Sequence, residues 1–203
     1  LWVGETEITR REWALLMPAM PEERSACGME CPVSDVNWWE AVFYANELSQ
    51  REGLEPCFDL VGCIVDKERG TGDCDNVTSR GVDCEGYRLP TEVEWEVAAR
   101  AGGTIRSPSV LDAEVSAQYS SGGPVRSSHP NPWGLYDVFG SVWEWMADLG
   151  ALDLPNPASD PAGRSFHSFR ATRGGSAVGS AGGAGAAARS THSPSYRSSD
   201  VGF

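Results

Sequence analysis

The fold of this chain is decided by the stretch Gly134-Leu-Tyr-Asp-Val-Phe-Gly-Ser-Val-Trp-Glu-Trp145, which ends in a strand-like piece, Val142-Trp-Glu-Trp145. Other motifs lie on both sides of it. Tyr87-Arg-Leu-Pro-Thr-Glu-Val-Glu-Trp-Glu-Val-Ala-Ala-Arg100 comes before it, and Arg173-Gly-Gly-Ser176 and Val201-Gly-Phe203 follow. Several motifs in a fixed order are far more specific than any one of them, so we interpret them together.

These motifs resemble the formylglycine-generating, sulfatase-modifying family. Two further segments match it near the start of the chain, Val3-Gly-Glu-Thr-Glu-Ile-Thr9 and Cys31-Pro-Val-Ser-Asp-Val-Asn-Trp-Trp-Glu-Ala41. The resemblance implies an α+β, C-type-lectin-like fold with small sheets, two to three helices and many loops. It covers nearly all of residues 1–203, which we expect to form a single domain trimmed at both ends.

The composition limits the classes of partner. The chain carries 29 acidic and 16 basic residues, a net charge of -13, which repels phosphate backbones and argues against a nucleic-acid ligand. No run of about 18 apolar residues is present, so no transmembrane segment is expected. The first residue is Leu1 and not Met, so a signal or anchor could have been removed, and no conclusion about the compartment follows from its absence.

All six cysteines lie in the first 84 residues. Their even number and irregular spacing favour disulfides, with zinc as the alternative. We expect a local bridge between Cys27 and Cys31, with the other four cysteines tying down the loop from Cys57 to Cys84. Disulfides would indicate a secreted or cell-surface protein.

Sequence signals predict three helices. Thr9 and Glu12 have capping-box spacing and precede a helix that Pro18 and Pro21 end. Ser34 and Asp35 precede a second helix with Gly53 at its C-terminal cap. Thr91 and Glu94 begin a third that stops at Gly102-Gly103. Residues 54–86 between the last two are predicted to be a long, cysteine-stapled loop or short hairpin.

The family resemblance implies one calcium ion and no second one, because the insertion that carries the second site is missing. Carboxylates at Asp137 and Glu144 and the backbone carbonyls of Gly140 and Val142 would supply the oxygen ligands that calcium prefers. The alternative is that Asp137 and Glu144 only hydrogen-bond the backbone of a tight turn.

The catalytic cysteines implied by the resemblance are missing. Formylglycine-generating enzymes have copper-binding cysteines three and eight residues after the Gly-Gly-Ser motif, where this chain has Gly179 and Ala184. Neither provides sulfur, so we expect no copper and no formylglycine generation by that mechanism. The three histidines, His129, His167 and His192, form no paired motif. Whether the chain is an enzyme stays open at this point, and the residues favour a non-catalytic protein.

Residues 177–200 are rich in Ala, Gly and Ser and contain no Lys, Gln, Glu, Met or Trp. This pattern resembles the variable proteins of diversity-generating retroelements, which display diversified residues near the C-terminus of the same fold. A general bias toward Ala, Gly and Ser would produce a similar composition.

We therefore expect a ligand-binding domain for an unknown protein, peptide or glycan. The alternative is an oxidoreductase of the same superfamily that uses iron or a metal site not visible in this chain. Arg189 and Arg197 would either contact ligand or pair with buried carboxylates. The expected ligand-binding residues are Val178, Gly179, Ser180, Ser190, Thr191, His192, Tyr196, Ser198, Ser199 and Asp200.

Overall fold

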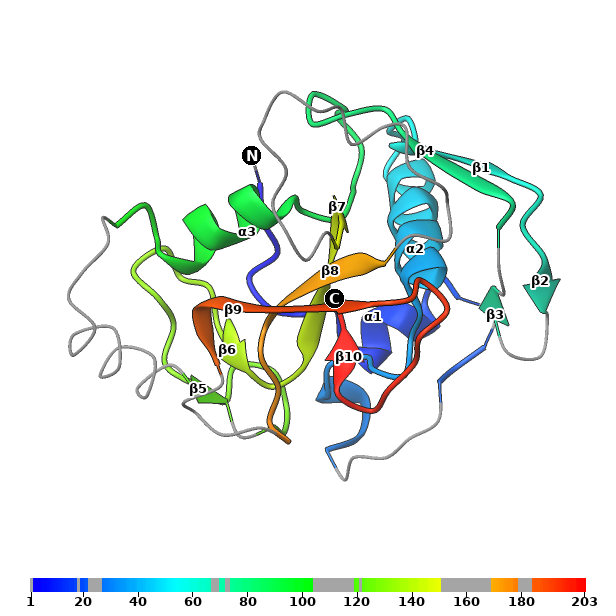
Figure 1. Cartoon of the computed structure of the whole chain (residues 1–203). Coiled ribbons are helices and arrows are strands. Elements are labelled where there is room, and N and C mark those ends of the chain that lie inside the picture. The colour runs from blue at the N-terminus through cyan, green and yellow to red at the C-terminus, as the bar shows by residue number, and fades with distance from the viewer. Residues whose placement is uncertain are drawn as a thin grey trace.

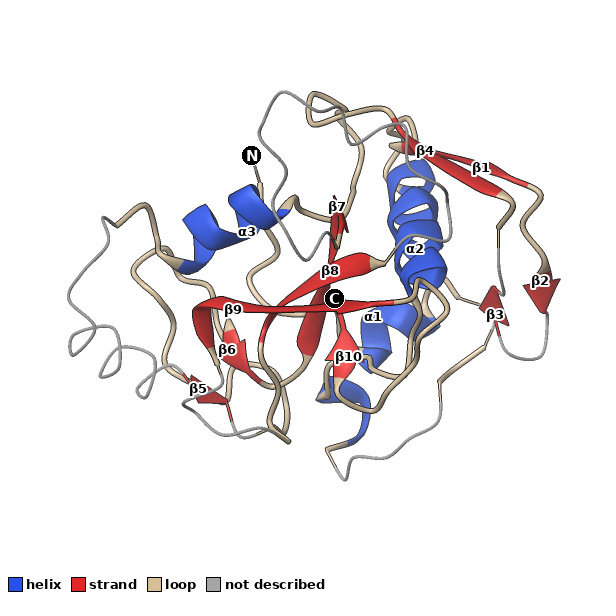
Figure 2. Ribbon diagram, viewed as in Figure 1, coloured by secondary structure: helices blue, strands red, loops and turns tan. Residues whose placement is uncertain are grey.

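A computed structural model describes residues 2–17, 19–21, 27–66, 70–71, 74–103, 119–120, 122–150, 169–178 and 184–203 (Figure 1). It confirms the expected α+β class, with few helices around small sheets (Figure 2). The helices are α1 (Arg10–Ala14), η1 (Gly28–Glu30, a 3-10 helix), α2 (Trp38–Arg51) and α3 (Glu92–Ala99). The strands are β1 (Phe58–Val61), β2 (Val65–Asp66), β3 (Gly70–Thr71), β4 (Asn76–Ser79), β5 (Tyr119–Ser120), β6 (Phe139–Gly140), β7 (Trp143–Leu149), β8 (Arg170–Gly174), β9 (Gly185–His192) and β10 (Val201–Gly202).

The central sheet is built from the C-terminal motifs. Its strand order is β10-β7-β8-β9, with β7, β8 and β9 antiparallel and β10 parallel to β7 (Figure 1). Strand β7 therefore lies between β8, which contains the start of the Arg-Gly-Gly-Ser motif, and β10, the last strand of the chain.

The two ends of the chain meet beside this sheet. Ile8 donates its N–H to the Phe203 carbonyl (2.9 Å), and Val33 donates to the Ile8 carbonyl (2.7 Å). Gly202 is required here because a Cβ would lie 2.3 Å from the Val33 carbonyl oxygen. The segments around Ile8, Val33 and Phe203, which are far apart in the sequence, are therefore joined by backbone hydrogen bonds.

The helix caps follow the sequence with one correction. Thr9 with Glu12 and Thr91 with Glu94 form the predicted capping boxes. For α2 the N-cap is Asn37, paired with Glu40, and not Ser34 or Asp35. Asp35 does not cap the helix because it lies two residues before Asn37 and has a left-handed backbone (φ 62°), whereas an N-cap residue has an extended one. The first helix is also shorter than predicted and ends at Ala14, before Leu16 and Met17.

Tryptophans dominate the core. Trp38 and Trp145 are nearly or fully buried in one cluster between α2 and the sheet. Each indole N–H donates to a backbone carbonyl, Trp38 to Met146 (2.9 Å) and Trp145 to Val36 (3.0 Å). These paired bonds remove the penalty for burying the indole nitrogens and fix α2 against β7.

The cysteines form three disulfides, Cys27–Cys31, Cys57–Cys84 and Cys63–Cys74, and none is free. The predicted local bridge and the stapled 57–84 loop are confirmed, and zinc ligation by these cysteines is wrong. The loop contains two short antiparallel pairs, β1 with β4 and β2 with β3. Such disulfides are typical of proteins that fold outside the reducing cytoplasm.

Candidate ligand-binding face and calcium site

Strand β9 is fixed to α3 by an ion pair between Arg189 and Glu92. Arg189 donates two hydrogen bonds to Glu92, from Nε at 2.6 Å and from Nη2 at 3.0 Å. Two parallel bonds of this kind set both distance and orientation. Arg189 is therefore a structural partner of a carboxylate, which was one of the two alternatives for it.

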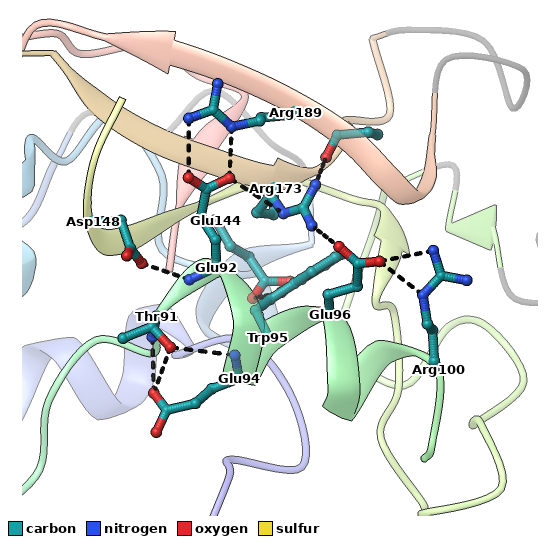
Figure 3. A network of polar contacts seen from close by, with 11 residues as sticks. Thr91, Glu92, Glu94, Trp95, Glu96, Arg100, Glu144, Asp148, Arg173 and Arg189 are labelled. Atoms are coloured by element: carbon teal, nitrogen blue, oxygen red, sulfur yellow. Dashed lines mark hydrogen bonds and ion pairs between the residues drawn. The ribbon is translucent and has the colours of Figure 1, made fainter. Parts of the chain in front are cut away.

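A wider polar network continues from this pair (Figure 3). Arg173 of β8 forms an ion pair with Glu96 and donates to the Ala188 carbonyl (3.1 Å), and its guanidinium lies 5.3 Å from the ring centre of Trp95. Arg100 also pairs with Glu96 (2.8 Å). The network joins α3, β8 and β9, so the sheet edge that carries the C-terminal segment is held at several points.

A second arginine fixes the loop between β9 and β10. Arg197 pairs with both carboxylate oxygens of Glu40, which is only 1% exposed, and donates to the Asp35 carbonyl (3.0 Å). Burial raises the pKa of Glu40, while the hydrogen bonds and charge of Arg197 oppose that rise. Arg197 is thus also a structural partner.

Backbone hydrogen bonds complete the attachment of residues 193–200. Trp38 donates its N–H to the Pro194 carbonyl (3.0 Å) at the start of α2, and Trp143 donates to the Asp200 carbonyl (2.8 Å). The loop is consequently held at both ends and at Arg197.

Between the attachments at Arg189 and Asp200 lie six of the ten predicted ligand residues, whereas Val178 lies earlier, in the segment after β8. Val178 is 79% exposed, Tyr196 is 39% exposed and Ser199 is also exposed. Ser190 and Thr191 are partly exposed on β9. We call these five residues, together with His192, the C-terminal face. Gly179 and Ser180 lie outside the described residues.

His192 and Tyr196 form the aromatic part of the C-terminal face. Their rings stack at 4.4 Å between centroids, and the His192 ring meets the Trp145 ring edge-on at 5.9 Å. The Nε2 atom of His192 is buried without a hydrogen-bond partner. Burial lowers the pKa of His192, and the charge of Asp200 acts in the opposite direction.

Ser198 and Asp200, also predicted to bind ligand, hydrogen-bond within the protein. Asp200 accepts hydrogen bonds from the hydroxyls of Ser198 and of Ser176, the latter at 3.1 Å. Ser176 therefore donates to a carboxylate, whereas a nucleophilic serine needs a histidine that accepts its proton. The His192 Nε2 atom accepts no such bond.

The four predicted calcium ligands lie between Asp137 and Glu144. This segment contains β6, the turn after it and the start of β7. Asp137 is buried, has a left-handed backbone (φ 55°), and accepts N–H bonds from Arg126 and from Ser128 (2.9 Å). The Trp95 indole donates to Glu144 (2.9 Å). Asp137 therefore hydrogen-bonds backbone N–H groups, as the alternative to calcium binding predicted. Its carboxylate oxygens still have lone pairs that a cation could use.

Sequence reasoning missed Glu7, which lies close to this turn. It is 5% exposed, and neither carboxylate oxygen has a hydrogen-bond partner. Burial raises its pKa well above the usual value, as does the charge of Glu144, and the nearby Ser141 hydroxyl offsets only part of the rise without making a bond of ordinary geometry. An acidic residue within the family-like motif Val3–Thr9 was the available signal.

The electrostatics of this region fit a hard cation. Burial raises the pKa of Glu144 to about 7, with a further contribution from the charge of Asp137. In the described part of the chain, Glu7, Asp137 and Glu144 form no ion pair with Lys or Arg. No three acidic, His or Cys side chains among the described residues are close enough to bind a metal by themselves, so backbone carbonyls would have to contribute.

The copper positions of the family do not fit copper here. Gly179 lies outside the described residues, and Ala184 has only a methyl side chain. Copper(I) requires soft sulfur ligands, which neither residue supplies. Within the described residues, no helix is long and apolar enough to cross a membrane.

Comparison with known proteins places the chain in a family. It shares its fold with Treponema denticola variable protein 1 at a TM-score of 0.76 and 32% identity, over 98% of this chain and 81% of that one. It is 30% identical over 178 residues to the chaperone protein LppX of Paenibacillus barcinonensis, covering 71% of this chain and 60% of LppX. It is 38% identical over 117 residues to a formylglycine-generating enzyme of Thermomonospora curvata, covering 45% of this chain and 38% of the enzyme.

The chain therefore spans less than two thirds of these two curated relatives. The sulfatase-modifying factor enzyme 1-like domain matches residues 2–203. On that match, with the fold and motifs described above, the chain belongs to the sulfatase-modifying factor family.

Proposed function

We propose that this protein is a non-catalytic ligand-binding domain whose C-terminal face contacts a protein, peptide or glycan. One observation carries the proposal. Between Arg189 and Arg197 every residue except the buried Pro194 is exposed or partly exposed, while both arginines are tied to carboxylates of the helices. The likeness to a solved variable protein over 98% of the chain supports it.

The physical properties of the face suit such a role. Its side chains are small except at His192 and Tyr196, and stacked aromatic rings are common anchors in binding interfaces. Small residues around an anchor can be exchanged without disturbing the core, because none of them carries the charge pairs that hold β9. Diversification of residues 177–200 would act on this face.

The lack of sulfur at Gly179 and Ala184 supports a non-catalytic role. The chemistry of the formylglycine-generating enzymes requires thiolates at those positions. An oxidoreductase using another metal site is the alternative, and it predicts stoichiometric iron or copper in the purified protein. The disulfides support secretion or display at the cell surface.

We also propose one calcium ion held by the carboxylates of Asp137 and Glu144 and the carbonyls of Gly140 and Val142. A bound calcium ion would offset the buried negative charge of Asp137 and Glu144. It would also order the turn between β6 and β7. Calcium should raise the melting temperature by linkage, and Glu144→Gln should remove that rise. Glu55→Gln, a change at a highly exposed carboxylate, is the matched control and should keep the rise.

Binding can be tested by display. A library randomised at Val178, Ser190, Thr191, His192, Tyr196 and Ser199 would be selected against immobilised hen lysozyme. Saturable binders that soluble lysozyme displaces would support the proposal. Failure to recover any binder from a folded library would contradict it, as would oxygen-dependent oxidation of a cysteine peptide by the metal-loaded natural chain.

A further inference from the structure

A groove of about 1110 Å³ lies away from the C-terminal face. Its walls come from the segment Trp2–Ile8, the end of α1, the second half of α2, the loop 82–90 and α3. This volume is only slightly above the roughly 300–1,000 Å³ of small-molecule pockets, so the lining residues, and not the volume, indicate the kind of ligand.

The groove and the C-terminal face lie at opposite ends of α2. The loop of the face contacts the start of α2 through the bond from Trp38 to Pro194, whereas the groove uses Tyr44 to Glu52 near the end of the helix (Figure 1). Fourteen residues of helix span roughly 21 Å. One ligand on the face would therefore leave the groove accessible.

The rim of the groove carries several exposed apolar side chains. They come from the N-terminal segment, the end of α1, the turn after α2 and the loop 82–90. Exposed apolar side chains gathered along a groove are typical of interaction sites. The side chains are Trp2, Val3, Leu15, Leu54, Val82 and Tyr87.

The charge of the lining selects a cationic partner. Seven glutamates and two arginines contribute to it, and four of these glutamates already bond within the protein: Glu94 to Arg88, Glu5 to Arg126, Glu12 to Thr9 and Glu144 to the Trp95 indole. Glu7 is one of the seven, and both of its buried oxygens lack a donor. Those two oxygens are not accessible to solvent, so the exposed carboxylates of Glu52 and Glu85 are the ones that an ammonium or guanidinium group of a partner could reach.

We propose that this groove is a second binding site, which accepts a basic amphipathic helix of a partner protein. The apolar side of that helix would contact the rim residues, and its Lys or Arg side chains would meet the glutamates of the lining. Grooves with an apolar floor commonly bind amphipathic helices in this way. The site does not depend on the proposed function of the C-terminal face, so either can fail alone.

The test uses the whole chain and a fluorescein-labelled 14-residue peptide of Leu and Lys at helical amphipathic spacing. Binding is followed by fluorescence anisotropy at about 0.15 M salt, where non-specific attraction to the acidic protein is screened. We expect saturable binding with a Kd below about 100 μM. A peptide of the same composition in non-amphipathic order, and one with Glu in place of Lys, should bind at least about tenfold more weakly.

Variants locate the site. Replacing Leu15 and Val82 together by Asn keeps the net charge and should weaken binding about tenfold. The matched control replaces Val61 and Ile64, which are equally exposed but outside the groove, and should change the Kd less than twofold. Glu52→Gln and Glu85→Gln together, two changes at exposed carboxylates of the groove, should weaken binding about fivefold.

Absence of saturable binding would overturn the proposal. So would equal affinity for the reordered peptide, or equal losses in the groove and control variants.

Discussion

The polar network around α3 and the C-terminal face both include residues of β9, and they differ in how their side chains are bonded. In the network, Arg189 and Arg173 each bond to glutamates of the helix (Figure 3). On the face, Val178 and Ser199 are exposed and His192 Nε2 has no partner. The difference indicates that a few charged attachments hold β9 and the loop after it in place, so the face residues between them can vary.

The largest expected effect is at the attachment of the 193–200 loop. Arg197→Leu leaves Glu40 buried without a counter-charge, so we expect the free energy of unfolding to fall by about 4 kcal/mol. Urea denaturation measures it. Changing Glu40 to Leu as well should recover most of the loss, because a buried pair can be replaced by apolar side chains.

The neighbouring change Tyr196→Ala should cost less than about 1 kcal/mol. Equal losses at Arg197 and Tyr196 would remove the distinction between attachment and face.

Acid should lower the free energy of unfolding by protonating Glu94. The ion pair with Arg88 lowers the pKa of Glu94 to about 2, so its contribution is complete above its unfolded pKa of about 4.5. It is lost as the pH falls from there toward 2. Because Glu94 is partly exposed, solvent screening reduces the effect of the pair, so comparing unfolding of the natural chain and Glu94→Gln across this range should show a difference of about 1 kcal/mol that disappears at the acid end.

A smaller effect should appear on the face in milder acid. Because burial lowers the pKa of His192 in the folded state, the unfolded chain binds a proton first as the pH falls through about 6.5. Stability contributed by neutral His192 is therefore present above that pH and declines below it. His192→Phe keeps a ring to stack on Tyr196 and should lose this decline in thermal melts between about pH 7 and 5. If stability declines equally in the natural chain and in His192→Phe, then groups other than His192 cause the decline.

The smallest effect is expected for the exposed positions of the face. Val178→Lys and Ser199→Tyr should each change the free energy of unfolding by less than about 0.5 kcal/mol. Thermal unfolding would check both. A loss above about 2 kcal/mol at either position would mean that the face contributes to the core.

Local signals predicted local structure well. Thr9 with Glu12 and Thr91 with Glu94 gave correct helix starts because a capping box depends on residues three apart. Asn37 was missed because Ser34 and Asp35 offer the same cap chemistry just upstream. The disulfide pairing within the 57–84 loop was left open for a similar reason, since sequence alone does not fix connectivity.

Long-range partners could not be predicted. Glu92 lies 97 residues from Arg189, and Glu40 lies 157 residues from Arg197, so the two roles of these arginines stayed undecided. Glu7 was missed because its burial depends on Asp137 and Glu144 meeting it in space. The calcium ligands and the ligand-contacting residues remain predictions.

A protease-resistance scan of every single substitution from Gly185 to Phe203 would test the division between attachments and face most directly. We predict that nearly all changes at Arg189, Arg197 and Gly202 destabilise the fold, while Ser190, Tyr196 and Ser199 accept most residues. Uniform sensitivity along the segment, or greater sensitivity at the exposed positions, would contradict a variable binding face on a fixed support.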